Sequence, residues 1–172
     1  MAEIALMRGD ITTVHVDVIV NAANAGLRGG GGVDGAIHAA GGPVIMEACR
    51  TLMRQRALLK PGEVVATTAG ELPAKFVFHA VGPVYDDASR AEVAVQLARC
   101  YREALALAEE MQLKSIAFPN ISTGVYGYPK PEAAAIATET VRSFIAAGTE
   151  LQKICYVCFD LENYEIYRNL LA

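Results

Sequence analysis

Short apolar runs rich in Val, Ile and Phe recur along the chain, and longer stretches with helical periodicity separate them. Runs of this length that are bounded by Gly, Pro, Asn or Asp are typical of strands. The sequence therefore predicts strands at Glu3–Met7, Val16–Val20, Glu63–Thr68, Phe76–Val81, Ser115–Phe118 and Ile154–Phe159.

The stretches between these strands carry apolar residues three and four positions apart, which is the period of an amphipathic helix. One helix is expected to open at Ser89, because Ser89 to Glu92 matches a capping box. Another is expected to begin near Pro131, since proline is favoured in the first helical turn. The remaining helices are predicted at Val33–Ala40, Val44–Leu58 and Leu161–Leu171.

The alternation of strands and helices predicts an α/β sandwich with a mainly parallel sheet and helices on both of its faces. The strands at Glu63–Thr68 and Phe76–Val81 are the exception. Only the seven residues 69–75 separate them, which is too few for a parallel crossover, so they should pair antiparallel. A chain of 172 residues is expected to form a single domain, residues 1–172, with a substantial core.

Polar or glycine-bearing segments follow four of the predicted strands. Two are short, Gly9–Asp10 and Phe159–Asp160, and two are long loops, Asn21–Gly35 and Asn120–Tyr128. Parallel strands bring their carboxyl ends to one edge of a sheet, where α/β proteins bind ligands. We therefore expect the four segments to meet at one binding site.

The loop at Asn21–Gly35 is where we expect the chemistry. It holds six glycines, four of them consecutive at Gly29–Gly32, and such a run loses chain entropy without contributing packing. The usual reason is an anion bound by main-chain N–H groups at a helix N-terminus. If the helix begins at Val33, Asp34 and His38 lie one turn apart on one face, which suits hydrolytic chemistry.

A dinucleotide-binding fingerprint is the alternative interpretation of this loop, because Gly30–Gly35 matches Gly-X-Gly-X-X-Gly. Two observations disfavour it. Nine residues separate the predicted strand from Gly30, and Thr51–Gln55, in the region where the fingerprint places an acidic ribose ligand, contains no acid. The chain also lacks the Gly-X-X-X-X-Gly-Lys-Ser/Thr motif of P-loop proteins.

The loop at Asn120–Tyr128 could bind a second phosphate through successive N–H groups around Ser122 to Gly127. By itself this loop would be interpreted as an ordinary strand-to-helix connection. Together with the first glycine loop it predicts a site for a diphosphate. Tyr126 is placed to close over a ligand, although the tyrosines of this loop could instead brace it.

Several side chains have a structural alternative that the sequence leaves open. Asp10 suits a cap as well as a ligand contact, and Phe159 suits the core as well as a stacking surface for a base. His38 suits either a structural or a catalytic role. His15 and His79 have no suggestive companions, and no cluster has metal-ligand spacing, so we expect neither histidine to be catalytic and no metal.

Composition and charge exclude several classes of protein. The chain is 53% hydrophobic and 20% charged, which is typical of a globular domain rather than a disordered chain. A net charge of −4 argues against a general nucleic-acid coat. No apolar run reaches the roughly 20 residues of a membrane helix, and the N-terminus lacks a signal-peptide pattern, so we expect a cytoplasmic protein with no membrane partner.

Two of the four cysteines form a Cys-X-X-Cys motif, Cys155 to Cys158, which in other contexts binds zinc or carries out redox chemistry. Here it lies inside a predicted strand. Residues three apart in a strand point to opposite faces of the sheet, so the two thiols could neither share a metal nor pair easily. We expect both to be core cysteines.

Three motifs together resemble the macrodomains, and specifically the MacroD-type ADP-ribosyl hydrolases. They are Val18–Asn24, Gly29–His38 and Ser122–Pro129, and the similarity extends from Gly9 to Asp160. The bacterial members described as O-acetyl-ADP-ribose deacetylases are the most similar. The resemblance implies a three-layer α/β/α domain on a six-stranded mixed sheet, with an ADP-ribose cleft at the strand ends.

The resemblance also implies where the ligand lies. Asp10 would receive the adenine amino group beside the Ile11 main chain, and Phe159 would stack on the adenine. The diphosphate would be held by main-chain groups of Gly31, Gly32, Val33, Ser122, Thr123, Gly124, Val125 and Tyr126. A ligand with two phosphates suits two loops that each offer N–H groups at a helix start.

At the reacting end, the resemblance places Asn24 on the distal ribose and Asp34 beside the ester to be cleaved, with His38 implicated in hydrolysis. Asp34 could act as a general base or only position the water while a ligand phosphate oxygen activates it. His38 could orient Asp34 or the water. No Ser–His–Asp arrangement is present, so we expect no covalent intermediate, and no cofactor is implied.

We therefore expect a monomeric hydrolase that acts on O-acetyl-ADP-ribose, on mono-ADP-ribosylated acidic side chains of proteins, or on both. A module that binds ADP-ribose without cleaving it would use the same pocket, but would have no need for Asp34 and His38. Regulation through contact with another protein, such as a ribonuclease, is a third possibility. Binding to poly-ADP-ribose or nucleic acid is disfavoured for an acidic single domain.

Overall fold

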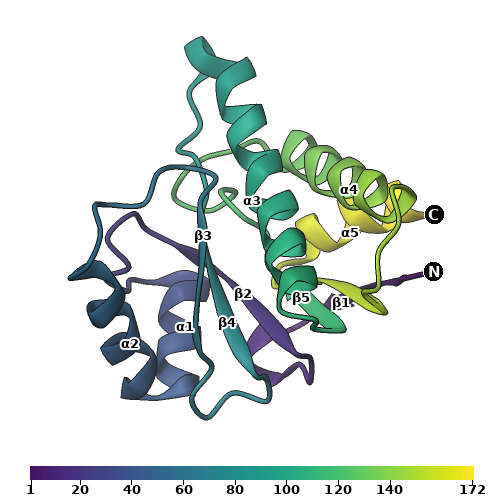
Figure 1. Ribbon diagram of the computed structural model, residues 1–172. Coiled ribbons are helices and arrows are strands. Elements are labelled where there is room, and N and C mark those ends of the chain that lie inside the picture. The colour runs from purple at the N-terminus through teal and green to yellow at the C-terminus, as the bar shows by residue number, and fades with distance from the viewer.

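The computed structural model describes residues 1–172 and contains one six-stranded sheet in the order β1-β6-β5-β2-β4-β3 (Figure 1). Every neighbouring pair is parallel except β3 and β4, which pair antiparallel. The predicted mixed, mostly parallel sheet is therefore confirmed, including the one reversed strand. The strands are β1 (Glu3–Arg8), β2 (Val18–Ala23), β3 (Val64–Thr68), β4 (Phe76–Val81), β5 (Ser115–Phe118) and β6 (Lys153–Cys158).

Helices cover both faces of the sheet and produce three layers (Figure 1). Helices α1 (Gly32–Gly41) and α2 (Pro43–Met53) pack on one face over a core cluster of 17 buried residues. Helices α3 (Arg90–Glu110), α4 (Lys130–Ala146) and α5 (Leu161–Leu171) pack on the other face over a cluster of 25. Two short 3-10 helices, η1 (Ile11–Thr13) and η2 (Asp87–Ser89), lie in the connections. None of the helices is long and apolar enough to cross a membrane.

Strand β2 does not occupy the predicted residues Val16–Val20 but runs to Ala23. Its extension takes in Asn21, which the sequence placed in the loop because asparagine favours turns. In the structure Asn21 is fully buried, and its amide finds hydrogen-bond partners in Asp34 and His79. These partners satisfy the amide nitrogen, while Oδ1 is buried without a hydrogen-bond partner. A side chain held in this way can continue a buried strand.

Helix α2 ends at Met53 instead of the predicted Leu58. The apolar residues beyond it belong to the following loop and not to a helical face. The N–H group of Leu59 donates to the Ala25 carbonyl at 2.9 Å, and the Leu59 side chain is buried in the core. Long-range contacts therefore end the helix where the local pattern would have continued it.

The predicted start of a helix at Ser89 is confirmed, because Ser89 is the N-cap of α3. The capping box itself is wrong, because the Ser89 side chain makes no capping hydrogen bond. The 3-10 helix η2 runs directly into α3, so helical structure begins before Ser89. The cap of η2 is Asp86, whose Oδ1 accepts from the Ala88 N–H at 3.1 Å.

The two cysteines of the Cys-X-X-Cys motif lie on opposite faces of β6, as predicted. Cys155 belongs to the core under α1 and α2, and Cys158 to the core under α3, α4 and α5. Both are free thiols, and burial raises the pKa of Cys158 to about 11. Neither is suited to nucleophilic chemistry, because the thiolate is the reactive form.

Candidate functional site

A cleft of about 600 Å³ opens at the carboxyl ends of the parallel strands. All four of the segments that follow these strands contribute to it, as the sequence predicted. Helices α1, α4 and α5 begin around its rim because each follows one of those strands. The residues predicted to contact a ligand all line it: Asp10, Ile11, Asn24, Gly31, Gly32, Val33, Asp34, Ser122, Thr123, Gly124, Val125, Tyr126 and Phe159.

The glycine loop presents open main-chain N–H groups at the start of α1. Gly31 is the N-cap, with no side-chain cap, and the N–H groups of Gly32 and Val33 donate no hydrogen bond within the chain. Gly35 lets the loop turn back on the helix, because a Cβ there would lie 2.5 Å from the Gly30 carbonyl oxygen. The positive end of α1 is therefore free to bind an anion.

The second loop presents a similar surface. The four N–H groups from Thr123 to Tyr126 donate no hydrogen bond within the chain. Ser122 enters the loop with φ of +68°, unusual for a residue with a side chain, and its hydroxyl donates to the Pro83 carbonyl at 2.8 Å. Gly82 permits this approach, since a Cβ there would collide with the Ser122 hydroxyl.

Asp34 is held by side chains from two elements. Its Oδ1 accepts from Asn21 Nδ2 at 2.8 Å and lies 3.3 Å from His38 Nε2. The predicted one-turn spacing of Asp34 and His38 on α1 therefore produces a contact. Oδ2 accepts no hydrogen bond within the chain, and Asp34 lines the cleft although it is only 7% exposed. One carboxylate oxygen is thus fixed and the other is available to a ligand or water.

His38 does not line the cleft. It reaches the cleft only through Asp34, and its Nδ1 is buried without a hydrogen-bond partner. This placement favours an orienting role for His38 over direct contact with a ligand.

The sequence missed the part played by His79. It is fully buried on β4 directly opposite Asn21, and its Nδ1 lies 3.1 Å from Asn21 Nδ2. On its other side Nε2 lies 2.8 Å from the Thr67 hydroxyl. Because an amide nitrogen can only donate, Nδ1 must accept, so Nε2 carries the proton and donates to Thr67. Burial, with a contribution from nearby His38, lowers the pKa of His79 to about 3, so the ring is neutral.

Asn24 braces the glycine loop. Its Nδ2 donates to the Gly29 carbonyl at 2.8 Å, and its Oδ1 accepts from the Arg28 N–H at 2.9 Å. The predicted contact of Asn24 with a ribose is compatible with this position, because the amide keeps one N–H and one lone pair unused. Local spacing could have suggested the bracing, since its partners lie four and five residues away.

The far end of the cleft has an acceptor beside an aromatic plate. Asp10 caps η1, with Oδ1 accepting from the Thr12 N–H at 2.9 Å, while Oδ2 makes no hydrogen bond within the chain. Phe159 is 78% exposed and lines the cleft, so it is not a core residue. An exposed phenyl ring at a cleft wall is suited to stacking on a base.

The two loop tyrosines have different surroundings. Tyr128 is buried and its ring packs edge-on against Tyr85, with centroids 4.9 Å apart, so it braces the loop. Tyr126 is half-buried and lines the cleft. No three His, Cys, Asp or Glu side chains are grouped so that they could share a metal ion.

Comparison with known sequences relates this chain to one family. The family described as Macro domain matches residues 20–137. A protein of Enterobacter cloacae named O-acetyl-ADP-ribose deacetylase is 52% identical over 170 residues, covering 99% of this chain and 94% of its own length. One of the same name from Klebsiella pneumoniae is 55% identical over 164 residues, covering 95% and 93%.

Solved structures give the same result. A mutant of the Oceanobacillus iheyensis macrodomain with ADPR superimposes with a TM-score of 0.92 at 44% identity, covering 96% of this chain and 90% of that one. The Trypanosoma brucei macrodomain in complex with ADP-ribose gives 0.90 at 41% identity, covering 98% and 69%. The predicted three-layer fold is confirmed by these neighbours.

Proposed function

Because this chain belongs to the Macro domain family, we propose that it binds ADP-ribose and hydrolyses an ester at the distal ribose. The substrates are O-acetyl-ADP-ribose, proteins that carry mono-ADP-ribose on acidic side chains, or both. The relatives named above as O-acetyl-ADP-ribose deacetylases and the neighbours solved with ADPR or ADP-ribose support the proposal.

The order of groups along the cleft fits that ligand from end to end. Adenine would lie between Phe159 and the free Oδ2 of Asp10, which can accept from its amino group. The two loops with open N–H groups would then hold one phosphate each. The distal ribose would reach Asn24 and bring its ester to Asp34.

One observation carries the hydrolytic part of the proposal, namely the asymmetric environment of the Asp34 carboxylate. Asn21 fixes Oδ1, whereas Oδ2 is free in the cleft. A fixed carboxylate with one open oxygen can orient a water molecule and accept its proton as the water attacks the ester carbonyl. The bond between the acyl carbon and the ribose oxygen then breaks, the proton passes from Asp34 to that oxygen, and the acid and the ribose hydroxyl leave. A pure binding module would gain nothing from burying this charge.

The proposal is tested by giving purified protein O-acetyl-ADP-ribose and, separately, a protein carrying mono-ADP-ribose on a carboxylate side chain. We expect time-dependent release of acetate or of ADP-ribose, followed by chromatography. ADP-ribose binding without release from either ester would show a non-catalytic binding module and overturn the hydrolase.

Replacing the exposed phenyl ring of Phe159 should weaken ligand binding without affecting the fold. We expect Phe159→Ala to lower ADP-ribose affinity by roughly 10-fold, since stacking of a base on an aromatic ring contributes about 1–3 kcal/mol. Calorimetric titration measures the change, and Phe159→Tyr, which keeps the ring, is the matched control. The melting temperature should stay the same because Phe159 is 78% exposed. Equal affinity in wild type and Phe159→Ala would mean that adenine does not stack there.

A further inference from the structure

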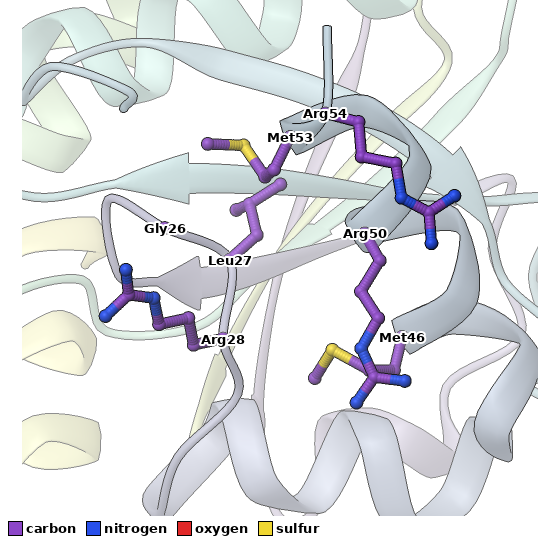
Figure 2. Close-up of a pocket in the computed structure, with 7 residues that line it drawn as sticks. All are labelled: Gly26, Leu27, Arg28, Met46, Arg50, Met53 and Arg54. Carbon is purple, nitrogen blue, oxygen red and sulfur yellow. The ribbon is translucent and has the colours of Figure 1, made fainter. Parts of the chain in front are cut away.

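A second pocket, of about 430 Å³, lies beside the cleft between the glycine loop and helix α2 (Figure 2). Leu27, Met46 and Met53 give it apolar walls. Met46, Arg50 and Met53 share one face of α2, because they are four and three residues apart. Figure 2 shows the loop residues on one side and the α2 residues on the other, with arginines from both: Arg28 from the loop, and Arg50 and Arg54 from the helix.

These three arginines gather positive charge at one place in a chain whose net charge is −4. Arg56, Arg90 and Arg168 each form an ion pair with a glutamate. By contrast, the side chains of Arg28, Arg50 and Arg54 form no ion pair and no hydrogen bond within the chain, and all three residues are exposed.

No carboxylate of the protein neutralises this pocket. The one acidic residue of α2, Glu47, is exposed and makes no ion pair. Figure 2 shows Arg28 extending away from α2 and Arg54 extending away from the loop, so the positive charge lies around the rim of the pocket. The rim therefore offers positive charge to more than one external carboxylate, beside apolar side chains that suit aliphatic groups.

This arginine pocket, lined by Gly26, Leu27, Arg28, Met46, Arg50, Met53 and Arg54, adjoins the reacting end of the cleft through Gly29. A Cβ at Gly29 would lie 3.0 Å from Met46 Cε, in the pocket wall, and 3.9 Å from His38 Cδ2. His38 in turn contacts Asp34. The wall of the pocket therefore lies next to the His38–Asp34 pair at Gly29, on the side of the cleft where the ester is expected.

We infer that the arginine pocket binds acidic residues that flank the ADP-ribosylated side chain of a protein substrate. This inference rests on the proposed function, because the ADP-ribosyl group anchors the peptide in the cleft. Aspartate and glutamate side chains supply carboxylates for the guanidinium groups. Their methylenes and the peptide backbone suit Leu27, Met46 and Met53. A free acetyl ester of ADP-ribose is too short to use the pocket, so the arginines would select protein substrates over the small one.

The test uses peptides that carry ADP-ribose through a non-hydrolysable amide in place of the ester, so that binding is measured without turnover. One peptide has glutamates on both sides of the modified residue, and its partner has glutamines. Calorimetry compares them on wild type, on the triple variant Arg28→Gln/Arg50→Gln/Arg54→Gln, and on Arg102→Gln. Arg102 is an exposed arginine on α3 that likewise forms no ion pair, which makes it the matched control.

We expect wild type to bind the glutamate peptide about 5- to 10-fold more tightly than the glutamine peptide, with the advantage falling as salt is raised. The triple variant should lose the advantage, and Arg102→Gln should keep it. ADP-ribose alone should bind all three proteins equally, which also shows that the triple variant is folded.

Equal binding of both peptides by wild type, or an advantage that survives in the triple variant, would overturn the inference. It would also be overturned if the arginines were needed to bind a single-stranded oligonucleotide while the peptides bound alike, since the pocket would then recognise phosphates. If wild type preferred the glutamate peptide but hydrolysed neither ester, the proposed hydrolase activity would be wrong and the inferred binding site for acidic residues would still hold.

Discussion

Asp34→Ala should reduce the turnover of ester hydrolysis by at least about 100-fold, the lower range for loss of a positioned acid or base. Affinity for ADP-ribose should change by no more than a few-fold, because the adenine contacts lie elsewhere and the phosphate contacts are main-chain N–H groups that the substitution leaves in place. Steady-state kinetics on O-acetyl-ADP-ribose gives the first quantity, and calorimetric titration with ADP-ribose gives the second. A fall in turnover with binding retained identifies a group that acts on the transition state.

Asp34→Asn separates the two roles that remain open for this carboxylate. The asparagine keeps an oxygen to accept from Asn21 but cannot take a proton. If Asp34 is the general base, the asparagine variant should be as inactive as the alanine variant. If a ligand phosphate activates the water and Asp34 only orients it, Asp34→Asn should retain measurable turnover. Wild-type turnover in Asp34→Ala would place the chemistry elsewhere.

Asn21→Ala should have the second largest effect, on both turnover and stability. The change removes the donor to Asp34 Oδ1 and leaves the buried His79 Nδ1 without a partner. A buried polar group left unsatisfied costs about 1–3 kcal/mol of unfolding free energy. We also expect turnover to fall roughly 10-fold with KM little changed, because Asn21 is a positioning residue that acts through Asp34. Denaturant titration and steady-state kinetics measure the two effects.

Thr67→Val is the control that separates stability from positioning. It removes the hydroxyl that His79 Nε2 contacts at 2.8 Å and leaves the contact between Asn21 and Asp34 intact. We expect a similar loss of stability with turnover near that of wild type. If Thr67→Val and Asn21→Ala lowered turnover equally, loss of stability would explain both and the positioning role of Asn21 would be wrong.

The sequence predicted the sheet and the convergence of the loops because both follow from chain connectivity. The seven-residue link between β3 and β4 was enough to predict their antiparallel pairing. Asp34 and His38 could be paired from sequence because helical periodicity brings residues four apart together. The roles of individual ligand contacts, including that of Asn24, remain predictions.

What the sequence could not predict depends on contacts between distant segments. His79 follows Asn21 by 58 residues, and only the parallel register of β2 and β4 makes them neighbours. Its isolation in the sequence led only to the prediction that it is not catalytic and gave no sign of its contact with Asn21. Similarly, the arginine pocket combines a loop and a helix that are distant in the sequence. Arg28 of the loop precedes Arg50 of the helix by 22 residues and Arg54 by 26.

The buried histidine also makes the fold sensitive to acid. His79 has an ordinary pKa of 6.5 when the chain is unfolded and about 3 in the native protein, where burial excludes the charged form. Between these values the unfolded chain binds the extra proton, so acidification favours unfolding, by up to about 1.4 kcal/mol for each pH unit from this ring alone. Above pH 6.5 the neutral ring does not reduce the free energy of unfolding, and the stability is lost progressively as the pH falls toward 3. The ring that accepts a hydrogen bond from Asn21 near neutral pH therefore destabilises the sheet when acid protonates it.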